Sequence, residues 1–301
     1  MAAVSGVYAA AITPRRQGPE IDLASMFELI DFLAGAGVSG IALMGATGEF
    51  LHFSIEDRSR LVSLAVKRSR LPILAGAGHS TFDGALTLAR DAADAGAAGV
   101  LVMPPSFYSY GQADIRHFYM RLAGELKGAC PIYLYNIPQF ASEIRPETAI
   151  DLLSTGEFAG IKDSAPSWES FAAVAEARER LGFTLLAGRD AFYLKARGIG
   201  ADGIISGAAS AVPELLTALD HALTARADDR AAALDASLQQ FLAWLDCAPA
   251  PMVIREAVAL RGLRTGPHAS PPSDETRREL DVFAEWFRGW SPDVLRQCSH
   301  G

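Results

Sequence analysis

The chain has 301 residues, carries a formal net charge of −8, and half of its residues are hydrophobic. This length suits one large α/β barrel or two ordinary domains. The acidic balance argues against a nucleic-acid-binding surface, which needs a basic stripe. No apolar run is long enough to cross a bilayer, so we expect no membrane partner.

The start of the chain and its cysteines bear on its compartment. Residues 1–12 are apolar, lack a basic region and lead straight into Thr13-Pro14, which indicates a first strand and not a signal peptide. The three cysteines, Cys130, Cys247 and Cys298, are far apart and show neither metal-ligand spacing nor a disulfide framework. We therefore expect reduced thiols and a cytoplasmic protein.

Short apolar runs alternate with helical patterns along the first 225 residues. The apolar runs predict strands over 7–12, 40–44, 72–75, 99–103, 131–135, 158–162, 183–187 and 202–206. The patterns that follow them predict helices over 23–33, 55–66, 81–95, 112–126, 146–153, 167–181, 192–197 and 213–225. Further on, we expect helices over 230–245, 251–261 and 273–286 without intervening strands, and a frayed tail from Ser291.

Eight strand–helix units in succession predict a parallel sheet, and at this length they favour a closed (β/α)8 TIM barrel. The alternative is an open, doubly wound sheet. It is disfavoured because no Gly-x-Gly-x-x-Gly motif follows the first strand. We expect a catalytic barrel domain over residues 1–226, and over 227–301 a C-terminal helical extension that is not an independent domain.

Lys162 is the residue that suggests a chemistry. Lys67 and Lys127 fall at the ends of helical patterns and Lys195 lies within one, whereas only Lys162 ends an apolar strand. Burial disfavours a charged ammonium and lowers the pKa of lysine. A partly neutral amine can attack a carbonyl and form a Schiff base. The alternative is a salt-bridged lysine at a strand end, paired with Asp163.

In a (β/α)8 barrel the active site lies at the carboxyl ends of the strands. Gly45-Ala46-Thr47-Gly48 follows the second strand, and its glycines let backbone N–H groups approach an anion such as a carboxylate. The alternative is a plain turn. Tyr135 ends the fifth strand, where a phenol can relay protons or can be a core residue with a satisfied hydroxyl. With Lys162, these residues describe a class I aldolase that acts on a 2-keto acid. Further residues stand at the ends of the last two strands: Gly188, Asp190 and Ser206.

Three motifs resemble those of the dihydrodipicolinate synthase/N-acetylneuraminate lyase superfamily: Gly45-Ala-Thr-Gly-Glu49, Tyr135-Asn-Ile-Pro138 and Gly160-Ile-Lys-Asp163. Pro104-Pro105 also fits, and the likeness runs from about residue 7 to residue 262. The resemblance implies a barrel with a C-terminal helical bundle, assembled as a homotetramer. It implies pyruvate held as an imine on Lys162, Tyr135 as general acid/base, and a pyruvate carboxylate bound by Thr47 and the amides of Ala46 and Thr47.

Two departures from the family pattern affect the expected proton relay. Ala46 stands where many members have a hydroxyl residue that joins the tyrosine relay. Ser106-Phe107 stands where the synthases place a tyrosine supplied across the subunit interface, and Tyr108 and Tyr110 follow just beyond. Either tyrosine is a candidate to complete the relay.

Two further departures affect the expected substrate. Phe140 stands where the synthases have an arginine that holds a substrate carboxylate, and Asp190-Ala191 stands where the sialic acid lyases have Asp-Glu. Members that cleave or dehydrate 2-keto-3-deoxy sugar acids fit these changes better. We therefore interpret the chain as a Schiff-base-forming carbon–carbon lyase acting on pyruvate and a hydroxylated 2-keto acid. Phe140, Gly188, Asp190 and Ser206 are its candidate substrate-binding residues.

Several alternatives stay open. The same imine serves a dehydratase or a dihydrodipicolinate synthase, and a non-catalytic keto-acid-binding paralogue is disfavoured because Lys162 and Tyr135 are both present. A pyridoxal phosphate enzyme would also need a buried lysine, but we expect neither that cofactor nor a metal. The histidines are scattered and form no ligand motif: His52, His79, His117, His221, His268 and His300. We expect His79 in a loop.

Overall fold

The computed structural model describes residues 4–299. Its eight strands close into one barrel in chain order, and neighbouring strands run parallel, which confirms the expected (β/α)8 architecture. The strands are β1 (Gly6–Ala10), β2 (Gly40–Leu43), β3 (Ile73–Gly76), β4 (Gly99–Val102), β5 (Ile132–Asn136), β6 (Gly160–Asp163), β7 (Thr184–Ala187) and β8 (Gly203–Ser206).

Helices follow the strands as the sequence predicts. The first eight are α1 (Leu23–Gly35), α2 (Ile55–Arg68), α3 (Phe82–Ala95), α4 (Gln112–Leu126), α5 (Pro146–Ser154), α6 (Trp168–Leu181), α7 (Tyr193–Gly198) and α8 (Pro213–Thr224). Three more come after the last strand: α9 (Asp228–Leu242), α10 (Met252–Leu260) and α11 (Asp274–Ser299). Short 3₁₀ turns include η1 (Phe50–His52), η2 (Asp190–Phe192) and η3 (Ala208–Ser210).

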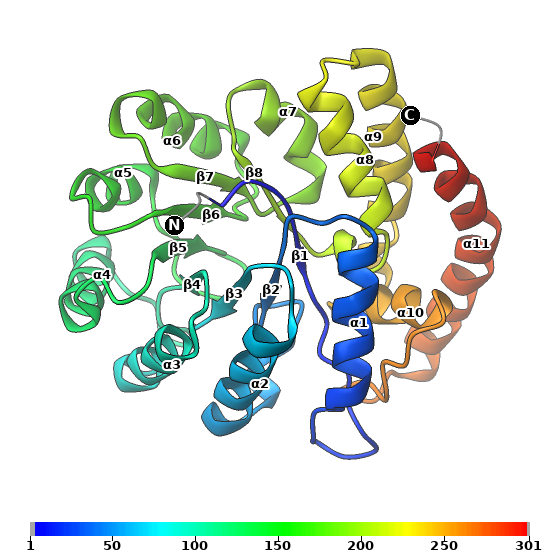
Figure 1. The fold of residues 1–301 in the computed structure, drawn as a ribbon, viewed down its shortest axis with the longest axis horizontal. Helices are drawn as coiled ribbons and strands as arrows, with labels where there is room; N and C mark the ends of the chain where they lie inside the picture. Colours follow the sequence, from blue (N-terminus) through cyan, green and yellow to red (C-terminus); the bar gives the residue numbers. More distant parts are fainter. Residues whose placement is uncertain (1–3, 300–301) are drawn as a thin grey trace. The chain divides into compact units, whose positions relative to one another are not determined.

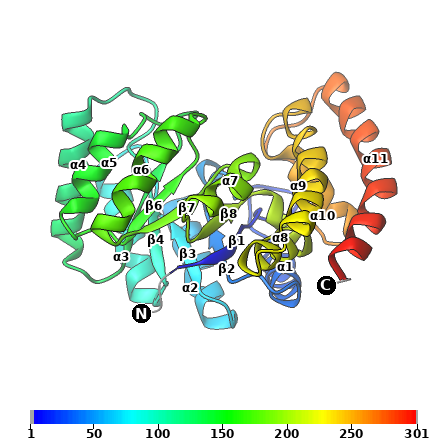
Figure 2. The same ribbon diagram turned by 90° about the horizontal axis from the view of Figure 1, so that it is seen from above.

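Two compact units make up the chain. The first contains Ile55–Ile205, hence strands β3–β7 and helices α2–α7, and Figure 1 shows α3–α6 lying outside its strands. The second contains Gly6–Ser54 and the residues from Ser206 onward, hence β1, β2, α1 and α8–α11. Within the second unit, α8 packs on α9 and α10 packs on α11, as both ribbon views show (Figure 1, Figure 2).

Local sequence signals set several helix ends. The Thr81 hydroxyl accepts a hydrogen bond from Gly84 N at 3.2 Å, and the Ser167 hydroxyl accepts one from Ser170 N at 3.1 Å, so these residues are the N-caps of α3 and α6. Gly96 ends α3 in the left-handed conformation, with φ of 82°, which glycine adopts without strain.

Helix α11 continues through Pro292, so the expectation of a frayed tail from Ser291 is wrong. A proline removes one helical hydrogen bond and usually ends or kinks a helix. Here the turns beyond it are held against α9. Val294 is buried, and Ser237 Oγ of α9 donates a hydrogen bond to Gln297 Oε1 at 3.0 Å. These tertiary contacts keep the helix intact beyond Pro292.

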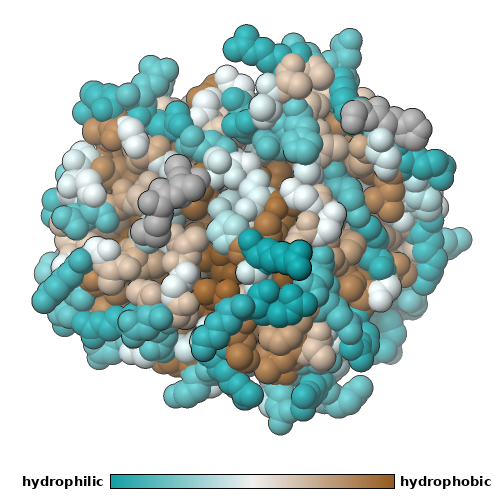
Figure 3. All heavy atoms as spheres, viewed as in Figure 1, coloured by the Kyte–Doolittle hydropathy of each residue, from teal (hydrophilic) through white to brown (hydrophobic). Residues whose placement is uncertain are grey.

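The strands are buried along almost their whole length, as parallel barrel strands are. On the face drawn in Figure 3, hydrophilic residues lie mostly toward the edge of the view, and hydrophobic residues show between them. None of the helices in residues 4–299 combines the length and the hydrophobicity that a membrane span requires.

Candidate active site

Lys162 and Tyr135 lie side by side at the carboxyl ends of β6 and β5, where the strand register pairs them directly. Each residue is only 5% exposed, and Lys162 Nζ lies 4.2 Å from the centroid of the Tyr135 ring. The other lysines, Lys67, Lys127 and Lys195, are exposed. The sequence prediction that Lys162 is the one buried lysine is therefore confirmed.

The Lys162 ammonium has neither an ion-pair nor a hydrogen-bond partner among the residues that the structure describes. It lies instead over the face of the Tyr135 ring. The Asp163 carboxylate is engaged elsewhere. Its Oδ1 accepts hydrogen bonds from Asn136 Nδ2 at 3.0 Å and from Ala165 N at 2.8 Å. The alternative of a Lys162–Asp163 salt bridge is thus wrong.

Asp163 is itself an unusual acid. It is 3% exposed, and burial raises its pKa to about 6, although hydrogen bonds from Ala165 N and Asn136 act in the opposite direction. Because side chains alternate along a strand, Asp163 lies on the opposite face of β6 from Lys162. It therefore belongs to the support of the site and not to the surface that a substrate meets.

Gly188 directly follows β7 and lies close to the side chain of Lys162. A Cβ atom at this position would lie 3.0 Å from Lys162 Cε and 2.1 Å from Ser164 Oγ, so only glycine fits here without displacing them. Gly188 N also donates to the Asp163 carbonyl at 2.7 Å. The Ser164 side chain thus reaches the same small region as the lysine side chain.

In the second unit, residues 44–49 form a tight turn after β2. Met44 and Glu49 adopt left-handed φ values of 56° and 54°, and Glu49 N donates to the Ala46 carbonyl at 3.0 Å. Thr13 Oγ1 donates to the Gly48 carbonyl at 2.8 Å, and a Cβ on Gly48 would come within 3.1 Å of Met44 N. The motif is therefore a well-held turn in which a side chain at position 48 would crowd the backbone of Met44 and Ala11.

Arg255 of α10 stabilises this turn through hydrogen bonds. It is 1% exposed, and its Nη1 donates to Glu49 Oε2 at 2.9 Å and to the Thr13 carbonyl at 2.9 Å. Its Nη2 donates to the Thr265 carbonyl at 2.6 Å. Glu49, which the sequence motif includes without a role, is thus half of a buried ion pair.

Other candidate residues lie in different surroundings. Phe140 is 54% exposed in the segment after β5, and Tyr108 is 67% exposed beside Phe107, with ring centroids 5.0 Å apart. Asp190 is half-buried at the start of η2. Ser206 is fully buried, and its hydroxyl accepts a hydrogen bond from Ala209 N of η3 at 2.9 Å.

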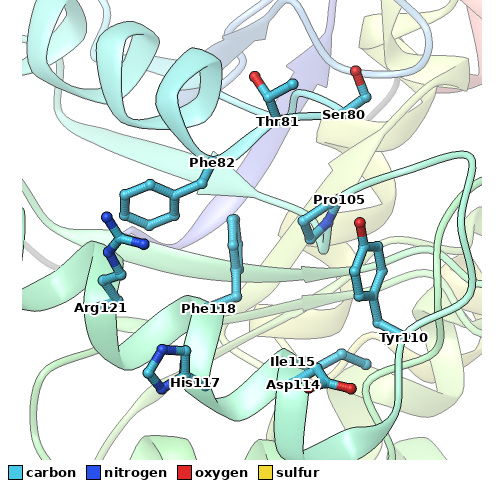
Figure 4. A pocket seen from close by; sticks show the side chains of 10 residues that line it. All are labelled: Ser80, Thr81, Phe82, Pro105, Tyr110, Asp114, Ile115, His117, Phe118 and Arg121. Atoms are coloured by element: carbon cyan, nitrogen blue, oxygen red, sulfur yellow. The ribbon is translucent and has the colours of Figure 1, made fainter.

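Tyr110 lines a cavity of about 520 Å³ between the amino-terminal parts of α3 and α4. Figure 4 shows Tyr110 near Pro105 at one end of this cavity and Arg121 near Phe82 at the other; the guanidinium carbon of Arg121 lies 4.2 Å from the centroid of the Phe82 ring. Neither Lys162 nor Tyr135 is among the residues that line it.

Metal-binding side chains do not cluster anywhere in residues 4–299: no group of three histidine, cysteine or acidic residues could hold an ion. His79 lies in the loop between β3 and α3, as expected, and its Nδ1 accepts a hydrogen bond from Thr81 N at 3.1 Å. Burial is the main cause that lowers the pKa of His79.

Sequence reasoning missed the residues that support the site. Asn136, Asp163 and Arg255 are polar, at least 97% buried, and each makes side-chain hydrogen bonds to other segments of the chain. The available signal was position: Asn136 and Asp163 immediately follow the two candidate catalytic residues.

Known proteins resemble this chain along most of its length. A 4-hydroxy-tetrahydrodipicolinate synthase of Methanosphaerula palustris is 29% identical over 272 residues, which cover 88% of this chain and 92% of that protein. An uncharacterised DapA-like lyase of Halobacterium salinarum is 30% identical over 284 residues, 92% of each chain.

Solved structures agree with the sequence relatives. The dihydrodipicolinate synthase of Aquifex aeolicus has a TM-score of 0.86 at 27% identity, covering 95% of this chain and 98% of that one. A prophage protein of the dihydrodipicolinic acid synthase family from E. coli K12, solved in complex with pyruvate, has a TM-score of 0.88 at 25% identity and covers 95% and 99%. The model of the dihydrodipicolinate synthetase family matches residues 3–282, and this chain belongs to that family.

Proposed function

We propose that this chain is a pyruvate-dependent class I aldolase that forms its Schiff base on Lys162 and acts on a hydroxylated 2-keto acid of the 2-keto-3-deoxy sugar acid type. Its membership of the family makes it a carbon–carbon lyase. The observation that carries the proposal is the environment of Lys162. This buried lysine has no ion-pair or hydrogen-bond partner among the described residues, and its Nζ lies 4.2 Å from the centroid of the Tyr135 ring near the ends of two paired strands.

The residues suit the following sequence of steps. The amine of Lys162 adds to the C2 carbonyl of the keto acid, and loss of water with uptake of one proton gives the protonated imine. Tyr135 takes the proton of the C4 hydroxyl while the C3–C4 bond breaks, and the bonding electrons move to the imine nitrogen as an enamine forms. The aldehyde leaves, C3 is protonated, and water releases pyruvate and the free amine.

The turn Gly45-Ala46-Thr47-Gly48 is proposed to bind the carboxylate of the keto acid. Its own geometry supports this role, because closely held backbone N–H groups in a turn with left-handed residues form an anion-binding concavity. Replacing Thr47 by Val removes the hydroxyl at similar volume. We expect this change to raise KM for the keto acid more than it lowers kcat.

Substrate choice is proposed to follow from Phe140, Asp190 and Ser206. A phenyl ring cannot pair with a carboxylate as an arginine fork does. A substrate with a charged amino-acid head would therefore lose that interaction, and unpaired burial of a charge costs several kcal/mol. A polyhydroxylated chain can instead hydrogen-bond to Asp190 and to backbone groups, while the fully buried Ser206 would act only through the position of η3.

The alternative activity is 4-hydroxy-tetrahydrodipicolinate synthesis, which several relatives carry in their names. Arg189 could then replace the missing arginine fork. Its guanidinium carbon lies 5.6 Å from the centroid of the Phe192 ring, and the residue is half-buried. A dehydratase that uses the same imine is a further alternative within the family chemistry.

The test is a comparison of kcat/KM for two reactions. We would measure pyruvate release from a panel of 2-keto-3-deoxy sugar acids, and condensation of pyruvate with aspartate semialdehyde, in the wild type and in Arg189→Ala. The exposed Arg180→Ala is the matched control. We expect cleavage or dehydration of a sugar acid to exceed condensation. Efficient condensation that collapses only in Arg189→Ala would establish the synthase instead.

The assembly and the absence of cofactors are also proposals. We propose a homotetramer that needs neither metal nor pyridoxal phosphate. Light scattering of the purified protein should give four times the 32.0 kDa chain mass, and activity should survive dialysis against a chelator.

A further inference from the structure

The residues that follow Tyr135 and Lys162 form a second pair behind them. The register of β5 and β6 sets Tyr135 opposite Lys162 and Asn136 opposite Asp163. Because successive side chains of a strand point to opposite faces, the second pair lies on the other side of the same two strand ends. Asn136 is 2% exposed and Asp163 is 3% exposed.

The side-chain amide of Asn136 both donates and accepts a hydrogen bond. Its Nδ2 donates to Asp163 Oδ1 at 3.0 Å, and its Oδ1 accepts a hydrogen bond from Ile144 N at 3.0 Å. Its backbone carbonyl also accepts from Ser164 N at 2.8 Å. A carboxylate at position 136 could not donate and an alanine could do neither, so the position demands a side chain that donates and accepts at once.

Asp163 accepts hydrogen bonds from two further segments. Its Oδ1 accepts from Ala165 N at 2.8 Å as well as from Asn136, and its backbone carbonyl accepts from Gly188 N at 2.7 Å. The two residues therefore join the ends of β5 and β6, the segment that returns at Ile144, and the start of the loop after β7. No charged side chain of the described residues forms an ion pair with Asp163.

We propose that Asn136 and Asp163 are a positioning pair, which holds Tyr135 and Lys162 at the spacing that imine formation requires. This inference rests on the proposed function of Lys162. Tyr135 and Lys162 are the last residues but one of β5 and β6, and the side-chain hydrogen bond between Asn136 and Asp163 joins the two strands at their final residues. A displacement of about 1 Å in such a pair can cost ~10² in rate.

The test measures the rate constant of imine formation at saturating pyruvate, followed by borohydride quench and mass analysis of Lys162. Because this rate constant is read from the time course, it does not depend on the fraction of folded protein. We expect Asp163→Ala and Asn136→Ala each to lower it by ~10–10². The double variant should be slowed by less than the product of the two single effects, since both changes remove the hydrogen bond between Asn136 and Asp163.

Asp163→Asn is the conservative variant that separates the hydrogen bond from the charge. Both donors approach Oδ1, and an asparagine oxygen in that place can accept from both. We expect its imine rate constant to stay within ~3-fold of the wild type, because the geometry is kept. If the alanine variants do not fold, Asn136→Leu/Asp163→Leu keeps the side-chain volume and should show the same loss.

Asp202→Ala is the matched control in the same unit. Asp202 accepts hydrogen bonds from Leu185 N at 2.8 Å and Arg178 Nε at 3.0 Å, just before β8 and so at the opposite end of the barrel strands. It should lower Tm and leave the imine rate constant unchanged. Alanine variants of the pair that lose only Tm, or an Asp163→Asn variant as slow as Asp163→Ala, would overturn the inference. A wild type that forms no adduct at all would instead refute the proposed function.

Discussion

At the scale of single residues, the environment of Lys162 decides what this chain can do. The side chain is buried, lies over an aromatic ring and has no carboxylate partner among the described residues. A structural lysine at a strand end would be paired, because an isolated buried charge is expensive. A lysine without a carboxylate partner is the kind of amine that can serve as a nucleophile towards a carbonyl.

Tyr135→Phe removes the phenolic hydroxyl and keeps the ring beside Lys162. General acid–base catalysis is typically worth ~10²–10⁴ in rate, so we expect kcat to fall within that range. The adduct with pyruvate should still form, more slowly, on Lys162. Steady-state kinetics and borohydride trapping check the two statements. A variant with the kcat of the wild type would mean that another group moves the proton, with Tyr108 and Tyr110 next in order.

Gly188→Ala places a methyl group where no space exists. The new Cβ would lie 2.1 Å from Ser164 Oγ and 3.0 Å from Lys162 Cε, so both side chains must move. We expect a loss of about 1–3 kcal/mol in the free energy of unfolding together with reduced kcat. Gly124→Ala in α4 is the control, since nothing lies within 4 Å of its Cβ. That change should stabilise the helix and spare activity; equal effects of the two would refute the steric argument.

Asp163 makes stability depend on pH. Burial raises its pKa to about 6 in the folded chain, against 3.8 for the ordinary group, so the folded state binds the proton more tightly than the unfolded state. Its contribution to stability is therefore complete below about pH 4 and is lost as the pH rises through about 6. Asp163→Asn cannot titrate. We expect its stability relative to the wild type to increase by about 2 kcal/mol from pH 4 to pH 7 in urea unfolding. A difference that does not change with pH would show an ordinary aspartate.

At the scale of elements, the apolar runs located all eight strands but not their last polar residues. We expected strands to end at Tyr135 and Lys162, whereas β5 and β6 extend to Asn136 and Asp163. A pattern of hydrophobic residues cannot include a buried polar pair, because the partner that satisfies each residue lies 27 positions away in the chain. The proximity of Tyr135 and Lys162 was thus predictable, and the polar pair behind them was not.

Glu49 and Arg255 connect the turn after β2 to helix α10 through a buried ion pair. Removing one partner leaves an uncompensated buried charge, which costs about 3–5 kcal/mol. We expect Glu49→Ala to destabilise the chain by that amount in urea unfolding. Glu28→Ala is the matched control, because its pair with Arg264 is 51% and 65% exposed and such pairs contribute about 0–1 kcal/mol. Similar losses in the two variants would contradict a special role for the buried pair.

At the scale of the whole molecule, the (β/α)8 fold was predictable because eight short apolar runs of similar length recur with amphipathic helices between them. Helix bounds agreed best where caps are local, as at Thr81 and Ser167. They failed at Pro292, where contacts with α9 carry the helix onward. The position of Phe140 on an exposed segment likewise depends on loop geometry, for which the sequence has no periodic signal.

The central claim is that this chain binds a keto acid covalently through Lys162, and one measurement tests it directly. The full-length protein is incubated with pyruvate and borohydride, digested, and its peptides are analysed by mass spectrometry, with Lys162→Met as the negative control. The account predicts a reduced pyruvate adduct on Lys162 and on no other lysine. Unmodified protein, or an adduct on the exposed Lys67, Lys127 or Lys195, would contradict it.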